Sequence, residues 1–254
     1  MSAINLWLSR FAHQLLPSVC LWCQQPLAPD EPQLCSYCQQ HLPRLDASLT
    51  QQNSLLLPPV QKGLSQARFD ALYTLTWYQQ PYRHWIQRWK FQQGLAEGEL
   101  LCQLLAEKAA ALSQNPAIVA DALGFAPASA ARLRQRGFNQ AQLLAQAIAR
   151  QWQRPCLALF HSPALIPHQT GLKRKERLAN LAGKIQLNSG DLPAHIALVD
   201  DVVTTGATMD WLTRLLKNAG VQRVDVWSLA VTPYSAASSS PSSSAESALN
   251  ILPR

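Results

Sequence analysis

The apolar residues of this chain occur in short runs and in longer stretches of helical spacing, and the two patterns alternate along the sequence. Runs of consecutive or alternating apolar residues, bounded by polar or turn-forming positions, predict strands. The candidate strands are 69–78, 118–123, 157–160, 196–199 and 223–231. Apolar residues that recur every three or four positions predict helices instead. The candidate helices are 82–91, 97–112, a segment that ends near Trp152, and 209–219.

This order of elements predicts an α/β fold. Strands that alternate with helices are typical of a parallel sheet flanked by helices on its faces. We assign this domain to residues 69–234. The preceding residues 45–68, rich in Gln, Leu and Pro without a regular period, are predicted to be a linker. The Ser-rich residues 235–254 are predicted to be a disordered tail.

Residues 1–18 form a separate pattern at the N-terminus. Trp7, Phe11 and Leu15 follow one another at helical spacing, which predicts a short amphipathic helix. We expect this helix to pack on the neighbouring module. The alternative is docking on a membrane surface or on a partner, although a single arginine is a weak basic face for such a role.

Two Cys-x-x-Cys pairs lie within residues 19–44 and indicate a metal site. The candidate ligands are Cys20, Cys23, Cys35 and Cys38. A two-residue gap lets both sulfur atoms of a pair reach one ion, and two pairs make a closed four-thiolate site. This arrangement predicts a structural Zn²⁺, with redox-active or unrelated cysteines as the alternative. Cys102 and Cys156 are solitary and are expected to belong to the core.

Composition and charge narrow the choice of partner and compartment. The 254 residues carry a formal net charge of +7, which suggests an anionic partner. The excess is concentrated in residues 122–190, with ten Lys and Arg against one acid. No apolar run approaches the ~20 residues that a membrane helix needs, and no secretory signal pattern begins the chain. We therefore expect a cytoplasmic protein whose thiols stay reduced, which suits cysteines that bind a metal.

Candidate chemistry gathers directly after the apolar run at 196–199. Asp200 and Asp201 come first, and a hydroxyl-rich loop with one glycine then leads into the helix at 209–219. Open α/β sheets bind ligands at the carboxyl ends of their strands, and the N–H groups that begin a helix attract anions. A second candidate anion site is the Arg-rich stretch 132–140, for which a solvated basic face is the alternative.

The sequence of residues 196–208 resembles the motif that binds 5-phosphoribosyl 1-pyrophosphate (PRPP) in type I phosphoribosyltransferases. In that motif an apolar run precedes two aspartates and a Thr-Thr-Gly-Ala-Thr loop. A response-regulator pocket would place its aspartates near the start of the domain. A P-loop ATPase would need a Gly-rich loop that ends in Gly-Lys-Ser/Thr, and this chain has none.

Further motifs, in their order along residues 19–231, resemble the ComF family. They are the paired cysteines, Lys90-x-x-x-Gly94, Arg136-Gly-Phe-Asn-Gln140, Gln169-x-Gly-Leu172 with Arg177-x-x-Asn180, and the PRPP motif. The resemblance implies a zinc knuckle before a type I phosphoribosyltransferase-like domain, and a role in competence or in the use of external DNA. Two stretches, 125–127 and 162–168, differ from the family's pattern where pyrophosphate is held. The resemblance therefore implies PRPP binding and leaves turnover open.

The resemblance also implies a role for each site residue. The residues implied to wrap the 5′-phosphate are Val202, Val203, Thr204, Thr205, Gly206, Ala207 and Thr208. Asp200 and Asp201 would hold the ribose hydroxyls, directly or through the waters of Mg²⁺. Lys90 and Arg136, with Lys173 or Arg174, would neutralise the pyrophosphate. The chain would then transfer phosphoribose to an acceptor that the sequence does not identify.

A second hypothesis is a non-catalytic accessory protein that binds a nucleotide or single-stranded DNA and partners a helicase-like protein of DNA uptake. Basic residues favour phosphate backbones without sequence preference. Four aromatic residues could stack on bases, although most tryptophans belong to cores. These four are Trp22, Tyr37, Trp85 and Trp89.

Overall fold

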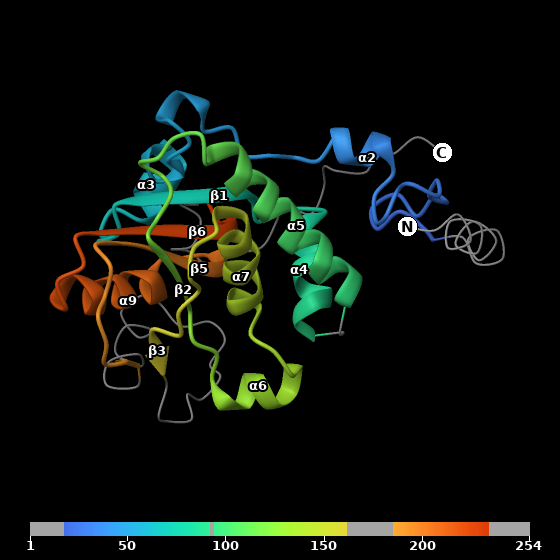
Figure 1. Cartoon of the computed structure of the whole chain (residues 1–254). Coiled ribbons are helices and arrows are strands. Elements are labelled where there is room, and N and C mark those ends of the chain that lie inside the picture. The colour runs from blue at the N-terminus through green and yellow to red at the C-terminus, as the bar shows by residue number, and fades with distance from the viewer. Residues whose placement is uncertain (1–17, 92–93, 162–184, 234–254) are drawn as a thin grey trace, which may run out of the picture.

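The computed structural model describes residues 18–91, 94–161 and 185–233. Its centre is a four-stranded parallel sheet of order β1-β6-β5-β2 (Figure 1). The strands are β1 (Ala71–Trp77), β2 (Ala122–Phe125), β5 (His195–Val203) and β6 (Arg223–Val231). A separate antiparallel pair is formed by β3 (Phe160–His161) and β4 (Gln186–Leu187). The predicted parallel α/β sheet is confirmed.

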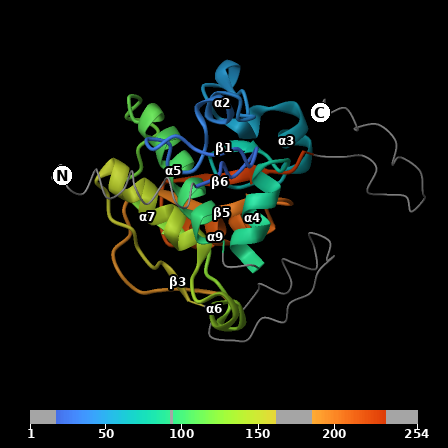
Figure 2. The same ribbon diagram turned by 90° about the vertical axis from the view of Figure 1, so that its right-hand side faces the viewer.

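Helices cover both faces of the sheet (Figures 1 and 2). One face packs against α4 (Tyr82–Phe91), α5 (Leu95–Leu112) and α7 (Gln140–Trp152). The other face packs against α3 (Pro58–Gly63) and α9 (Ala207–Asn218). The remaining helices are α2 (Ser36–Gln40), α6 (Ala130–Arg136) and the 3-10 helices η1 (Ser48–Thr50) and η2 (Ser54–Leu56).

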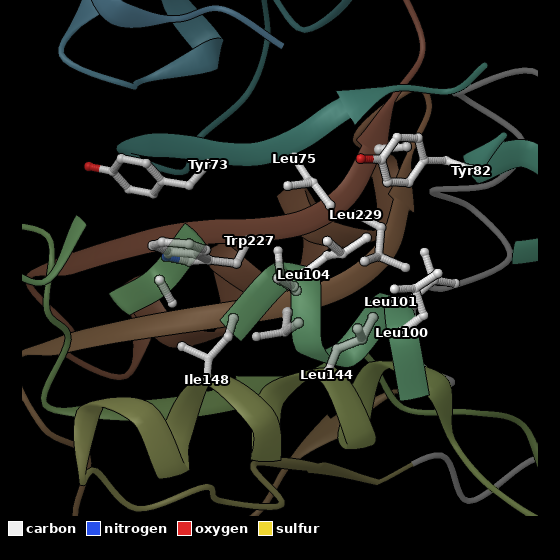
Figure 3. Close-up of a cluster of buried hydrophobic side chains, with 14 of the residues drawn as sticks. Tyr73, Leu75, Tyr82, Leu100, Leu101, Leu104, Leu144, Ile148, Trp227 and Leu229 are labelled. Atoms are coloured by element: carbon white, nitrogen blue, oxygen red, sulfur yellow. The ribbon is translucent and has the colours of Figure 1, made fainter. Parts of the chain in front are cut away.

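The apolar runs of the strands follow from burial on both faces. In β5, Ala197 and Val199 belong to the core that faces α5 and α7, whereas Ile196 and Leu198 belong to the core that faces α9. Successive side chains of a strand point to opposite faces, so a sheet covered on both sides needs consecutive apolar residues. Figure 3 shows the first of these cores, where Trp227 of β6 lies with leucines of α5 and α7.

Several boundaries differ from the predicted ones for local reasons. The strand predicted at 118–123 begins only at Ala122, because Ile118 closes a turn by donating its N–H to the Asn115 carbonyl at 3.0 Å. The helix predicted to run to Trp152 is preceded by the separate helix α6, which ends at Gly137 with φ +80°. Strand β5 continues past both aspartates to Val203. The candidate strand at 157–160 is reduced to β3.

Residues 45–68, which we expected to be a linker, pack as part of the domain. Leu45, Val60 and Leu64 are buried in the core beside α9. The Asn53 side chain caps η2 and also accepts a hydrogen bond from the Leu72 N–H of β1 at 3.0 Å. The absence of a helical period concealed this role, because the buried residues lie on short helices joined by turns.

The amphipathic helix expected at residues 1–18, the basic segment 168–180 and the Ser-rich tail 235–254 lie outside the described residues, apart from Ser18. Among the described helices, none combines the length and the apolar character that would let it cross a membrane.

Candidate functional site

The acidic pair lies at the carboxyl end of β5, between β6 and β2. Asp200 is in register with Ser228 of β6, and Asp201 follows it on the strand. The Asp201 N–H donates to Asp200 Oδ1 at 2.9 Å. The loop that follows turns at Gly206, which has φ +67° and precedes the first residue of α9. The strand thus delivers both carboxyl groups to the sheet edge where α9 begins.

Gly206 is required by both conformation and space. Its positive φ is strained for residues with a side chain. A Cβ there would also meet Leu64 Cδ2 at 2.7 Å. The cavity bounded by Asp200 and residues 202–209 holds only about 20 Å³, close to the space of one water molecule.

Lys90 reaches this corner from the last turn of α4. Its Nζ lies 2.5 Å from Asp201 Oδ2, and both side chains are largely buried. The structure therefore brings together three residues that the sequence predicted for one site, namely Lys90, Asp200 and Asp201. In this state Lys90 pairs with a carboxylate.

Arg136 approaches from α6 and is held by two contacts. Its Nη1 donates to Gln140 Oε1 at 3.1 Å, and its guanidinium carbon lies 5.1 Å from the centre of the Phe91 ring. Burial and the neighbouring charge of Arg132 lower the pKa of Arg136, while Asp201 opposes this effect. Arg136 therefore lies within electrostatic range of Asp201, with which Lys90 pairs.

The two carboxyl groups are electrostatically unequal. Burial, with a smaller contribution from the charge of Asp201, raises the pKa of Asp200 from 3.8 to about 7. The Asp201 N–H and Lys90 act in the opposite direction without cancelling the effect. A group held at such a pKa changes its charge near neutral pH, and perturbed carboxyl groups of this kind are concentrated at functional sites.

The segment 125–127, where the sequence departs from the ComF pattern, is fixed to the sheet and to α7. The Ala126 N–H donates to the Val199 carbonyl at 3.0 Å. Asn139 is buried, donates from Nδ2 to the Ala126 carbonyl at 2.9 Å, and accepts from the Ala141 N–H at the start of α7. The Asn of the Arg-Gly-Phe-Asn-Gln motif is therefore a structural link between β2 and α7.

The four predicted zinc ligands converge as expected. Their sulfur atoms all lie within 4.8 Å of one another, and those of Cys23 and Cys35 are 3.8 Å apart. Zn–S bonds of about 2.3 Å in a tetrahedron place sulfur atoms about 3.8 Å apart, so the cluster fits Zn²⁺. Among the hydrogen bonds that join the module to the domain are those from Trp85 Nε1 to the Leu21 carbonyl and from Gln33 Nε2 to Glu99 Oε2.

The structure corrects one expectation, refines a second and adds one residue. Trp85 and Trp89 are 1% and 2% exposed and cannot stack on bases, since both pack in the core. Cys102 and Cys156 pack against that core, as expected, but are only partly buried. Phe91 was missed, because its position in a helical apolar pattern predicted burial, yet 60% of it is exposed.

Comparison with known proteins gives a consistent family. No family profile matches the chain. Competence protein F of Haemophilus influenzae is 33% identical over 176 residues, which are 64% of this chain and 73% of that protein. DNA utilization protein YhgH of Escherichia coli K12 is 29% identical over 229 residues, 85% of this chain and 98% of that protein. Competence protein ComFC of Bacillus subtilis is 35% identical over 94 residues, 37% of each chain.

Two solved structures show only distant similarity. The glutamine PRPP amidotransferase of B. subtilis has a TM-score of 0.37 and 18% identity, and the match covers 53% of this chain and 27% of that chain. The purine phosphoribosyltransferase of Pyrococcus horikoshii has a TM-score of 0.32 and 18% identity, and the match covers 55% of this chain and 76% of that chain. The assignment rests instead on two sequence relatives, Competence protein F and YhgH, which match this chain over 73% and 98% of their own length. The chain belongs to the ComF family.

Proposed function

We propose that this ComF-family chain binds PRPP with Mg²⁺ at the carboxyl end of β5 and serves the uptake or utilisation of external DNA. The observation that supports this most directly is the placement of Asp200 and Asp201 where β5 meets the loop before α9. Carboxylates beside the N-terminus of a helix offer one ligand both hydroxyl acceptors and an anion site. A phosphorylated ribose has hydroxyl groups for the carboxylates and a phosphate for the anion site.

Each part of the corner has a separate role in this proposal. Backbone N–H groups and hydroxyls of residues 204–208 surround the 5′-phosphate, and the dipole of α9 favours its charge. Asp200 and Asp201 accept hydrogen bonds from the ribose hydroxyls or from the waters of Mg²⁺. Mg²⁺ is usually held by one or two carboxylates together with substrate phosphates, and a two-carboxylate corner fits this. Binding must also free Asp201 from Lys90.

Lys90, which pairs with Asp201, and Arg136, whose pKa is influenced by the charge of Asp201, are our candidates to neutralise the pyrophosphate. In a transfer reaction the bond from C1′ to the pyrophosphate oxygen breaks and a bond from C1′ to an acceptor forms. Positive charge develops on the ribose meanwhile, and fixed carboxylates stabilise such charge. The basic residues compensate the negative charge that leaves with pyrophosphate.

A second candidate function is that of an accessory protein for single-stranded DNA, without turnover and with a helicase-like partner. The exposed arginines of α6, Arg132 and Arg134, favour it, as do two exposed aromatic side chains of the zinc module, Trp22 and Tyr37. Such groups suit a nucleic-acid backbone and its bases. Turnover distinguishes the two functions.

Isothermal titration with PRPP and Mg²⁺, followed by an assay for pyrophosphate release with each common nucleobase, tests the proposal. We expect Mg²⁺-dependent binding, since the carboxylate pair alone repels a polyanion. Release of pyrophosphate with one nucleobase would establish transfer, and binding without release in any mixture would favour the accessory function. A zinc-loaded protein that fails to bind PRPP would contradict the proposed pocket.

Binding of PRPP with Mg²⁺ should weaken as the pH falls below about 7. The pKa of Asp200 is raised to about 7 by burial and by Asp201, so the free protein carries a proton there at lower pH, whereas binding favours the ionised carboxylate. We expect a loss of up to about tenfold per pH unit below the pKa. Titration calorimetry in two buffers of different ionisation enthalpy would show proton release near pH 6.5. Affinity and proton release independent of pH between 6 and 8 would contradict this role of Asp200.

A further inference from the structure

The last turn of α4 presents an aromatic ring beside the acidic corner. Phe91 directly follows Lys90, which pairs with Asp201, and 60% of Phe91 is exposed. The other aromatic residues of this helix, Tyr82, Trp85 and Trp89, are buried. Packing of α4 therefore uses these three rings and does not account for Phe91.

The guanidinium of Arg136 extends this surface. It lies 5.1 Å from the centre of the Phe91 ring and is oriented by the hydrogen bond to Gln140 Oε1. Within the described part of the chain, Arg136 Nε and Gln140 Nε2 are buried without a hydrogen-bond partner. Bases stack on aromatic rings and on guanidinium planes, and base carbonyls accept hydrogen bonds from such donors.

We propose that Phe91 and Arg136 form a stacking surface for a nucleobase next to the phosphoribose pocket. The position of the ribose rests on the proposed function, but recognition of the ring does not. If the proposed transfer takes place, this surface selects a purine or pyrimidine as the acceptor. Without transfer, it selects a nucleotide or one base of a DNA strand.

The test compares ligands that differ only in the base. In the first arm, the affinities of ribose 5-phosphate and of the four common ribonucleoside 5′-monophosphates are measured with the full chain. We expect at least one nucleotide to bind about 5- to 100-fold more tightly than ribose 5-phosphate, the range that one stacked base gives. In the second arm, an oligothymidylate is compared with an abasic strand of equal length and charge.

Phe91→Ala should remove the preference for the base in whichever arm shows it, and should leave ribose 5-phosphate and the abasic strand unaffected. Phe91→Trp should retain the preference, since the ring is restored. Leu95→Ala is the matched control, because Leu95 is also an exposed apolar residue, 71% exposed at the start of α5, and has no ring. Thermal unfolding of each variant checks that the fold is intact.

The outcomes separate this proposal from the proposed function. If PRPP with Mg²⁺ fails to bind while an oligothymidylate preference is present and is removed by Phe91→Ala, the phosphoribose pocket is contradicted and the stacking surface is supported. Equal affinities with and without bases in both arms would overturn the stacking surface. A preference that survives in Phe91→Ala would also overturn it.

Discussion

Replacing both aspartates, Asp200→Asn with Asp201→Asn, should lower the affinity for PRPP and Mg²⁺ by at least about 100-fold. Two charge-assisted hydrogen bonds contribute about 1.5–3 kcal/mol each, and each 1.4 kcal/mol is a factor of ten in affinity. The amides keep the size of the side chains but neither hold the cation nor accept with full charge. Isothermal titration measures the loss.

We expect the double variant to stay folded, so that its loss of affinity can be distinguished from loss by unfolding. The pKa of Asp200 is raised in the folded state, so its ionisation opposes folding increasingly as pH rises from about 4 to about 7. Asp200→Asn removes that effect, and the melting temperature at pH 8 should not fall. Asp121→Asn is the control that neutralises one carboxyl group at the amino end of β5, where Asp121 accepts the His195 N–H at 3.0 Å. Undiminished PRPP affinity in the double variant would contradict the assignment of the corner.

Of the changes considered, removal of the metal should lower the free energy of unfolding most. The module contributes Leu27, Leu34 and Leu42 to the core that it shares with α4, and it has little other apolar interior. Structural Zn²⁺ sites bind with about 10–16 kcal/mol in small domains. We expect Cys38→Ser to lower the free energy of unfolding by more than about 3 kcal/mol, and the melting temperature by about 10 °C.

Elemental analysis should give one zinc per wild-type chain and a strong chelator should reproduce the effect of Cys38→Ser. Cys102→Ser serves as the control, because Cys102 is partly buried on α5 and lies outside the four-cysteine cluster. A wild-type chain purified without zinc that melts at the same temperature as the zinc-loaded chain would contradict a structural metal.

The sheet was predictable from sequence because its strands are buried on both faces. The range of β6, 223–231, and that of α4, 82–91, agree with the predicted ranges. In these segments the apolar residues that set the sequence period are also the ones that are buried. The acidic corner was predictable for a different reason, since a strand, two acids and a helix start are consecutive in the chain.

Features that depend on residues distant in sequence were not predictable in this way. Nothing in the pattern around Lys90 indicates that its Nζ pairs with Asp201, and nothing around Phe91 indicates that its ring is exposed next to Arg136. The raised pKa of Asp200 likewise depends on how deeply the end of β5 is buried. The core role of residues 45–68 depends on single leucines in turns, which have no period to detect.

Helix α4 gives the metal module and the acidic corner a common support. Trp85 is hydrogen-bonded to the module through the Leu21 carbonyl, and Lys90, little more than one turn later, ends at Asp201. A rotation of this helix cannot change one contact without the other. By thermodynamic reciprocity, any effect of zinc on ligand affinity equals the effect of the ligand on zinc affinity. The affinity for zinc, measured with and without the ligand, therefore shows whether the ligand-binding pocket is coupled to the metal site, although the two sites do not share a residue.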